Sequence, residues 1–179
     1  MSLQLIEIVP AVAEKEAVRS IIDATSSAVT QASAELIESQ VTADHARVFV
    51  IVETQQDTPE GLAQTVRTAL GESVTEVTGP DEVRLVGAEL EDIKKLRGQT
   101  DYLVEWDIPA EITMDQYLAR KKANSPKYAE VPEVSFLRTY VREDTAKCLC
   151  FYNAPDEDAV VRARAAVSTP FDRMFKLEV

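Results

Sequence analysis

The chain repeats itself at an offset of 100 residues, and this repeat constrains its fold more than any other feature. An alignment without gaps places ELIESQVTADHARVFVIVE (35–53) above SFLRTYVREDTAKCLCFYN (135–153), with Asp44 on Asp144. The flanking segments follow in the same order: LQLIEIVP (3–10) matches YLVEWDIP (102–109), PEGLAQTVRTAL (59–70) matches PDEDAVVRARAAV (155–167), and EVRLVG (82–87) matches RMFKLEV (173–179). We therefore expect a fold that uses one structural unit twice.

Each half has the pattern of strand, helix, strand, strand, helix and strand. Short apolar runs predict the strands, and start signals predict the helices. Thr113 to Gln116 form a capping box, and Pro155 with its acidic followers is typical of a first helical turn. Turn residues at 42–46 and 142–146 predict hairpins. This order predicts an α+β chain of two ferredoxin-like repeats, each with a four-stranded antiparallel sheet and two helices on one face.

The middle strands lack the alternation of apolar and polar residues that marks a sheet with one solvated face. The segment RVFVIVE (47–53) is apolar at five consecutive positions, and CLCFY (148–152) behaves in the same way. We therefore expect the two antiparallel sheets to pack face to face with the helices outside, as an intrachain pseudo-dimer of the dimeric α/β-barrel type. The predicted boundaries are 1–88 for the first repeat, 89–101 for a connector with a short helix, and 102–179 for the second repeat.

The net charge of −12 argues against two classes of partner. Nucleic acids and anionic membranes attract the opposite charge, so we expect neither. No stretch approaches about 18 consecutive apolar residues, so no membrane span is predicted. Two cysteines, and a start without the signal-peptide pattern, predict a cytoplasmic location. Residues 1–88 hold 14 acidic and 5 basic residues, which makes this half a candidate docking face.

Cys148 and Cys150 are separated by one residue in a predicted strand. Alternate residues of a strand share a face, so the two thiols point the same way, about 6.5 Å apart, too far for a disulfide without distortion. Val48 and Val50 hold the equivalent positions in the first half. Buried packing is the favoured interpretation, and ligation of a metal by the two thiols is the alternative.

Residues 102–179 resemble a family of small ferredoxin-like domains known for a nickel-binding member and otherwise uncharacterised. The resemblance rests on YLVEWDIP, SFLRTYV, CLCFYNAPDEDAVVRARAA and PFDRMFKLEV. They supply a first strand ending in proline, a cysteine-containing third strand that runs into Ala-Pro and acidic residues, and a Pro-x-Asp turn before the last strand. Thr139-Tyr140 stands in place of the family's Ser-Tyr. The resemblance implies a ferredoxin-like fold, a homodimer, and nickel or another divalent transition metal as cofactor.

The last helix departs from the metal-binding members. Those members carry histidines near the positions of Arg164 and Ser168, and neither residue supplies an imidazole. Nickel favours imidazole nitrogen. The one histidine of the chain, His45, lies in a predicted hairpin turn, where a solvated side chain is expected. The resemblance therefore predicts the fold, whereas a nickel site at Cys148 and Cys150 is a hypothesis.

Three polar residues within apolar strands are candidates for a small-molecule pocket. Glu105 lies in YLVEWDIP, and Arg138 and Tyr140 share a face of SFLRTYV. Glu105 could act as a general base, with the other two side chains orienting a substrate. An internal Glu–Arg pair is the alternative, and we favour it. The basic segment RKKANSPKY (120–128) is interpreted as the solvated end of a helix, or as a contact for the acidic first half.

The sequence supports three hypotheses for function. The first is a small cytoplasmic binding protein, similar to the nickel-binding family, whose metal site is altered. The second is a dimeric α/β-barrel-type enzyme that acts on a small aromatic or apolar substrate through Glu105, Arg138 and Tyr140. The third is a non-catalytic interaction protein that docks through its acidic half. A Ser-His-Asp hydrolase and a Gly-rich phosphate loop find no support in the sequence.

Overall fold

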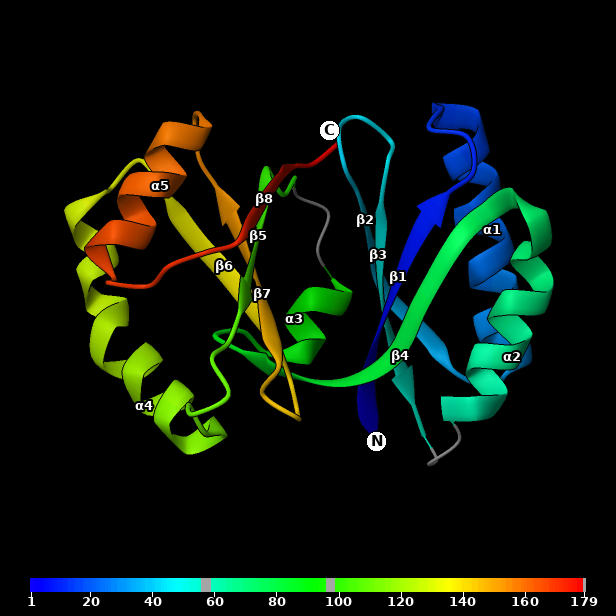
Figure 1. The fold of residues 1–179 in the computed structure, drawn as a ribbon, viewed down its shortest axis with the longest axis horizontal. Coiled ribbons are helices and arrows are strands. Elements are labelled where there is room, and N and C mark those ends of the chain that lie inside the picture. Colours follow the sequence, from blue (N-terminus) through cyan, green and yellow to red (C-terminus); the bar gives the residue numbers. More distant parts are fainter. Residues whose placement is uncertain (56–58, 96–98, 179) are drawn as a thin grey trace. The chain divides into compact units, whose positions relative to one another are not determined.

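Both halves of the chain have the predicted order of strands and helices (Figure 1). The computed structural model describes residues 1–55, 59–95 and 99–178. The first half contains β1 (Ser2–Pro10), α1 (Lys15–Gln31), β2 (Glu35–Val41), β3 (Val48–Thr54), α2 (Pro59–Leu70), the 3-10 helix η1 (Gly71–Ser73) and β4 (Val74–Val86). After the short α3 (Leu90–Lys94), the second half contains β5 (Tyr102–Asp107), α4 (Met114–Asn124), the 3-10 helix η2 (Ser125–Glu130), β6 (Ser135–Arg142), β7 (Lys147–Asn153), α5 (Glu157–Ala166) and β8 (Arg173–Lys176).

The strand order is that of a ferredoxin-like unit in each half. It runs β2-β3-β1-β4 in the first half and β6-β7-β5-β8 in the second, with antiparallel pairing. In each half the first strand therefore lies between the third and fourth strands, as the order strand, helix, strand, strand, helix, strand requires. The predicted α+β chain of two ferredoxin-like repeats is confirmed.

The chain divides into two compact units. The first unit consists of residues 1–83 with 93–95 and Glu178, and the second of residues 84–92 with the rest of the described chain from 99 to 177. The finer boundaries at 88 and 101 stay a prediction. No helix among the described residues is long and apolar enough to cross a membrane.

The two hairpin turns repeat each other in atomic detail. Asp44 accepts a hydrogen bond from the Ala46 backbone N–H at 3.0 Å, and Asp144 accepts one from Ala146 at the same distance. The residues between them, His45 and Thr145, have positive φ values of 59° and 61°. The Asx turn lets a non-glycine residue adopt this left-handed conformation, and it explains why aspartate recurs at an offset of 100.

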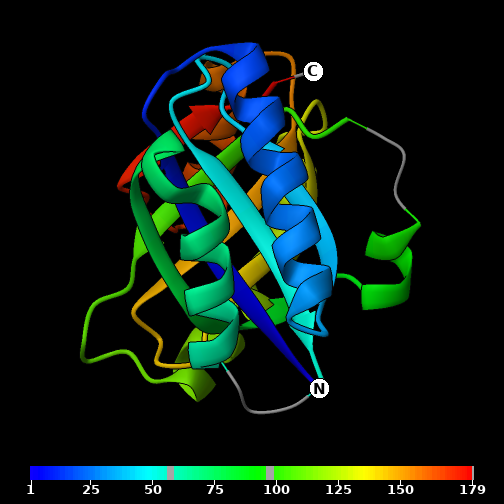
Figure 2. The same cartoon turned by 90° about the vertical axis from the view of Figure 1, so that its right-hand side faces the viewer.

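Each unit has its own core between its sheet and its two helices. In the first unit α1 and α2 cover one face of the sheet, and Figure 2 shows the two helices side by side. In the second unit α4 and α5 do the same, and their Tyr117 and Ala163 pack on β5 and β7. The predicted capping box begins α4, since the Gln116 N–H donates to the Thr113 hydroxyl and the Thr113 N–H donates to the Gln116 side chain.

The middle strands are buried on both faces, as their unbroken apolar runs predict. β3 is buried along its whole length, and so are the central residues of β7. Leu149 and Phe151, which point away from α4 and α5, are 0% and 1% exposed. The face-to-face packing of the two sheets concerns the placement of one unit relative to the other and stays a prediction.

Candidate functional site

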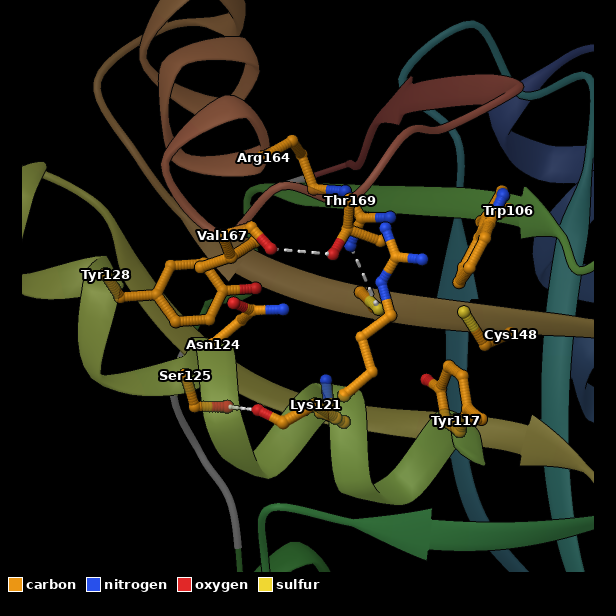
Figure 3. Close-up of a pocket in the computed structure, with 12 residues that line it drawn as sticks. Trp106, Tyr117, Lys121, Asn124, Ser125, Tyr128, Cys148, Arg164, Val167 and Thr169 are labelled. Carbon is orange, nitrogen blue, oxygen red and sulfur yellow. Dashed lines mark hydrogen bonds between the residues drawn. The ribbon is translucent and has the colours of Figure 1, made fainter. Parts of the chain in front are cut away.

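A small pocket lies in the second unit between α4, α5 and the helix-covered face of the sheet (Figure 3). Its volume is about 20 Å³, which is room for one water molecule or a small ion, because about 10–15 Å³ suffices for a water. Strands β5 and β7, helices α4 and α5, η2 and the segment after α5 all contribute. The lining residues are Trp106, Tyr117, Arg120, Lys121, Asn124, Ser125, Tyr128, Cys148, Cys150, Arg164, Val167 and Thr169.

Strand β7 places both cysteines at the floor of this pocket. Cys148 pairs across the sheet with Trp106 of β5, and Cys150 pairs with Thr139 of β6. Because side chains alternate along a strand, both thiols face α4 and α5. Each is a free cysteine, 1% exposed, within the core of the second unit. Their burial agrees with the packing interpretation. Their position in the pocket also brings them close to polar and charged side chains, which the sequence does not reveal.

Side chains from β6 and α5 donate to the sulfur of Cys150. The Thr139 hydroxyl donates to Sγ at 3.2 Å, and Nη1 of Arg164 lies 3.6 Å from the same atom. Cationic and hydroxyl donors favour a thiolate over a thiol. Cys150 is therefore the member of the pair that is better prepared to ionise.

Arg164 is a buried cation, and one of its N–H groups lacks a hydrogen-bond partner among the described residues. Figure 3 shows its side chain reaching from α5 into the space bounded by Tyr128, Tyr117 and Trp106. Nη1 donates to the Tyr152 hydroxyl at 3.1 Å and Nη2 donates to the Pro170 carbonyl. Nε has no hydrogen-bond partner among the described residues, although the whole side chain is 3% exposed. A buried N–H of a cation is costly to leave unpaired.

The pocket is positive within an acidic protein. Arg120 and Lys121 join Arg164 among the lining residues, which include no carboxylate. The guanidinium of Arg120 lies 5.5 Å from the ring centroid of Trp106. Burial lowers the pKa of Arg164, but Cys150 and the other nearby acceptors outweigh it and hold that pKa above its usual value. The site thus favours negative charge.

The two thiols have pKa values displaced in opposite directions. A hydrogen bond from the Cys148 thiol is the largest cause of the lowered pKa of Cys150. The charges of Lys121 and Arg164 lower the pKa of Cys150 further, against the effect of burial. The same hydrogen bond, together with burial, raises the pKa of Cys148. The pair therefore ionises at Cys150 first.

An aromatic wall closes the pocket on the η2 side. The hydroxyl groups of Tyr128 and Tyr152 are hydrogen-bonded at 2.7 Å, and Tyr128 stacks on Phe136 with ring centroids 5.4 Å apart. Burial raises the pKa of Tyr128 to about 12. This phenol stays neutral at ordinary pH and acts as a donor or acceptor.

Glu105, Arg138 and Tyr140 lie on the opposite face of the sheet. Glu105 and Tyr140 both pair with Leu149 of β7, and Arg138 pairs with Phe151. The structure thus brings the three residues to one face, as predicted, while the cysteines and the pocket are on the other. Whether they form a catalytic group stays a prediction.

The contacts of Glu105 are those of a buried ion pair. Its carboxylate accepts hydrogen bonds from Lys147 at 3.2 Å and from Arg173, and the side chain is fully buried. Arg173 also pairs with Asp107. Arg138 lies 4.6 Å over the ring of Phe151. Ion pairing of Glu105 agrees with the alternative that the sequence favoured, with Lys147 and Arg173 as partners that the sequence did not indicate.

His45 is held in its turn by a partner far along the chain. Its Nε2 lies 3.1 Å from a carboxylate oxygen of Glu178. The cysteine pocket belongs to the second unit, and no histidine is among its lining residues.

Sequence reasoning missed the cationic side of the pocket, although two signals pointed to it. The segment 120–128, interpreted as a solvated helix end, supplies Arg120, Lys121 and three further lining residues. In the sequence, Arg164 stands out only because metal-binding members of the family have a histidine near its position. Its contact with Cys150 depends on how α5 packs on β7, which no local pattern encodes.

Residues 102–177 match a family described as the nickel-responsive SCO4226-like proteins. No curated protein matches the chain. The crystal structure of SCO4226 from Streptomyces coelicolor A3(2) is 17% identical, covers 44% of this chain and 95% of its own, and has a TM-score of 0.38.

Other solved structures are similar to the whole chain. A candidate chlorite dismutase, TA0507, is 12% identical over 100% of this chain and 96% of its own, with a TM-score of 0.56. A mutant chlorite dismutase from Candidatus Nitrospira defluvii is 14% identical over 100% of this chain and 93% of its own, with a TM-score of 0.54. At such identities the likeness extends to the fold alone. The chain therefore shares the two-repeat fold of chlorite dismutase-like proteins, and its residues 102–177 are similar to the nickel-responsive SCO4226-like family.

Proposed function

We propose that the second unit binds a small anion in its cationic pocket, so that the chain acts as a ligand-binding protein. Arg164 lines the pocket. The observation that carries this proposal is that its buried Nε–H has no hydrogen-bond partner among the described residues. A charged donor in this position is matched by an anionic acceptor. Arg120 and Lys121 add positive charge to the pocket, and its lining residues include no carboxylate to balance it.

The pocket volume limits the size of the ligand. About 20 Å³ admits a halide or a carboxylate as small as formate, but no drug-sized molecule. Formate is a suitable probe, because its two oxygens can accept hydrogen bonds from the planar guanidinium of Arg164.

The residues of this pocket do not fit Ni²⁺. Its only ionisable acceptors besides two tyrosines are two thiols, and the described residues contain no group of three or more His, Cys, Asp or Glu side chains that could hold a metal. A divalent cation at Cys150 would also lie next to Arg164, whose Nη1 is 3.6 Å from the sulfur. Like charges at such distances repel strongly in a buried site. The nickel hypothesis is therefore not part of this proposal.

Trp106 provides the test, because it is the only tryptophan of the chain and lines the pocket. Sodium formate is titrated while its fluorescence is recorded, with sodium gluconate, too large for the pocket, keeping the ionic strength constant. We expect a saturable change that Arg164→Gln weakens at least about tenfold, equivalent to about 1.4 kcal/mol.

The matched control is Arg162→Gln on the same helix, because Arg162 is exposed and paired with Glu133 outside the pocket. This variant should bind formate as the wild type does. A linear, unsaturable signal, or equal affinities for Arg164→Gln and Arg162→Gln, would contradict the proposal.

The enzyme alternative on Glu105 has less support. Lys147 and Arg173 each donate to one oxygen of its carboxylate, and the side chain is fully buried, whereas a general base must come within hydrogen-bond reach of its substrate. The cytoplasmic location and the homodimer stay predictions. Cell fractionation and light scattering test them.

A further inference from the structure

We infer that Cys150 reacts with hydrogen peroxide and is oxidised to a sulfenic acid. The inference stands on the arrangement of Thr139 and Arg164 around its sulfur, inside a pocket of about 20 Å³. It rests on the same pocket as the proposed function, but it concerns chemistry at sulfur and not the binding of an anion.

The arrangement prepares the sulfur for attack. The thiolate is the reactive form of cysteine, and neighbouring cations favour it. Arg164 is close enough to stabilise the thiolate directly, while Lys121 lines the same pocket. The guanidinium of Arg164, whose Nη1 lies 3.6 Å from the sulfur, stabilises the negative charge that develops as the O–O bond breaks.

The reaction balances without a metal or a second cofactor. The Cys150 thiolate attacks one oxygen of the peroxide, so that an S–O bond forms and the O–O bond breaks. Sulfur is oxidised from thiolate to sulfenic acid, and the second oxygen leaves as hydroxide. The hydroxide takes up a proton from solvent, equal to the one that the thiol released on ionising, and becomes water. The net change is one thiol and one peroxide converted to one sulfenic acid and one water.

The position of Cys148 determines how long this product lasts. Two residues apart on β7, the cysteines have Cα atoms about 6.6 Å apart, near the upper end of the range that a disulfide bridges. Condensation therefore strains β7, a strand that is paired on both sides by β5 and β6, although the two thiols are close enough to share a hydrogen bond. Dimedone is therefore present during the oxidation, so that it traps the sulfenic acid before Cys148 condenses with it.

The small pocket also selects the oxidant. Hydrogen peroxide has two heavy atoms and fits a space of about 20 Å³. Cumene hydroperoxide carries a phenyl group and does not fit. Exposed thiols show no such preference, so the choice of peroxide reports on the pocket.

The test is peptide mass spectrometry after treatment with hydrogen peroxide and dimedone, which traps sulfenic acids. In the wild type we expect the adduct on Cys150 and not on Cys148, and none with cumene hydroperoxide on the same time scale. Cys150→Val, which copies Val50 of the first repeat, should give no adduct. An unmodified Cys150, or an adduct mainly on Cys148, would overturn the inference. The position of the adduct is determined in the wild type, so the test remains valid even if Cys150→Val fails to fold.

The formate titration on the same preparation separates the two claims. Formate binding without an adduct on Cys150 refutes the peroxide chemistry alone. An adduct on Cys150 without formate binding refutes the proposed anion site alone.

Discussion

Nη1 of Arg164 lies 3.6 Å from Sγ of Cys150, and both side chains are buried. This contact joins a residue of α5 to a residue of β7 and defines the charge of the pocket. It gives the second cysteine of the Cys-Leu-Cys segment a cationic neighbour, whereas the equivalent Val50 of the first repeat can only pack. The second repeat thus has a polar site at a position that is apolar in the first.

The thiol pair should titrate in two separate steps. Because its pKa is lowered, Cys150 should ionise below the ordinary cysteine value of about 8.5. Ultraviolet absorbance of the thiolate against pH measures this step. Cys148→Val should move it to higher pH, because the hydrogen bond from Cys148 is the largest cause of the lowered pKa, and Lys121→Gln should move it by less. A step that does not move in Cys148→Val would show that this assignment is wrong.

Quenching of the Trp106 fluorescence should depend on the sign of the quencher's charge. Its ring is 4% exposed and lies 5.5 Å from the Arg120 guanidinium. Iodide should therefore quench its fluorescence more than caesium does, since the positive pocket attracts anions. Arg120→Gln should reduce the difference between the two quenchers. Equal quenching by both ions in the wild type would argue against a positive pocket.

Glu105→Gln should affect stability and not the pocket. The change removes ion pairs with Lys147 and Arg173 from a fully buried carboxylate. We expect a loss of about 2 kcal/mol in the free energy of unfolding, below the 3–5 kcal/mol typical of a broken buried pair, because Arg173 is partly exposed and keeps Asp107. Urea denaturation measures it.

The control for this variant is Asp107→Asn, which removes the exposed pair with Arg173 and should cost less than about 1 kcal/mol. Formate affinity should be unchanged in both variants. Loss of formate binding in Glu105→Gln would revive Glu105 as a ligand-site residue.

Thr113→Ala should destabilise the helix that supplies four lining residues of the pocket. The Thr113 hydroxyl accepts the Gln116 N–H at 3.2 Å, and loss of such a cap costs about 1 kcal/mol. Gln116→Ala removes only the reciprocal bond and should cost less. Chemical denaturation of the two variants measures both losses in the free energy of unfolding. A larger loss for Gln116→Ala would show that the glutamine contributes most of the stability of the cap.

Much of the fold could be read from local patterns. The turn aspartates Asp44 and Asp144, the capping box at Thr113 and the burial of both faces of β3 and β7 are encoded within a few residues. The alternation of a strand also put Cys148 and Cys150 on one face. Such features follow from backbone geometry and need no knowledge of tertiary packing.

The polar contacts of the site could not be read in this way. Arg164 meets Cys150 across the interface of α5 with β7, and Glu105 meets Arg173 across the pairing of β5 with β8. A long side chain can reach several partners, so its choice depends on the placement of whole elements. The basic segment 120–128 was visible in the sequence, but its direction toward the cysteines was not.

The most direct test of the central claim is an amide NMR titration of the chain with sodium formate and, separately, with nickel chloride. Formate should shift the signals of Thr139, Cys150 and Arg164, while equimolar paramagnetic Ni²⁺ should leave them sharp. If nickel broadens these signals and formate leaves them in place, the pocket is a metal site and the anion account is contradicted.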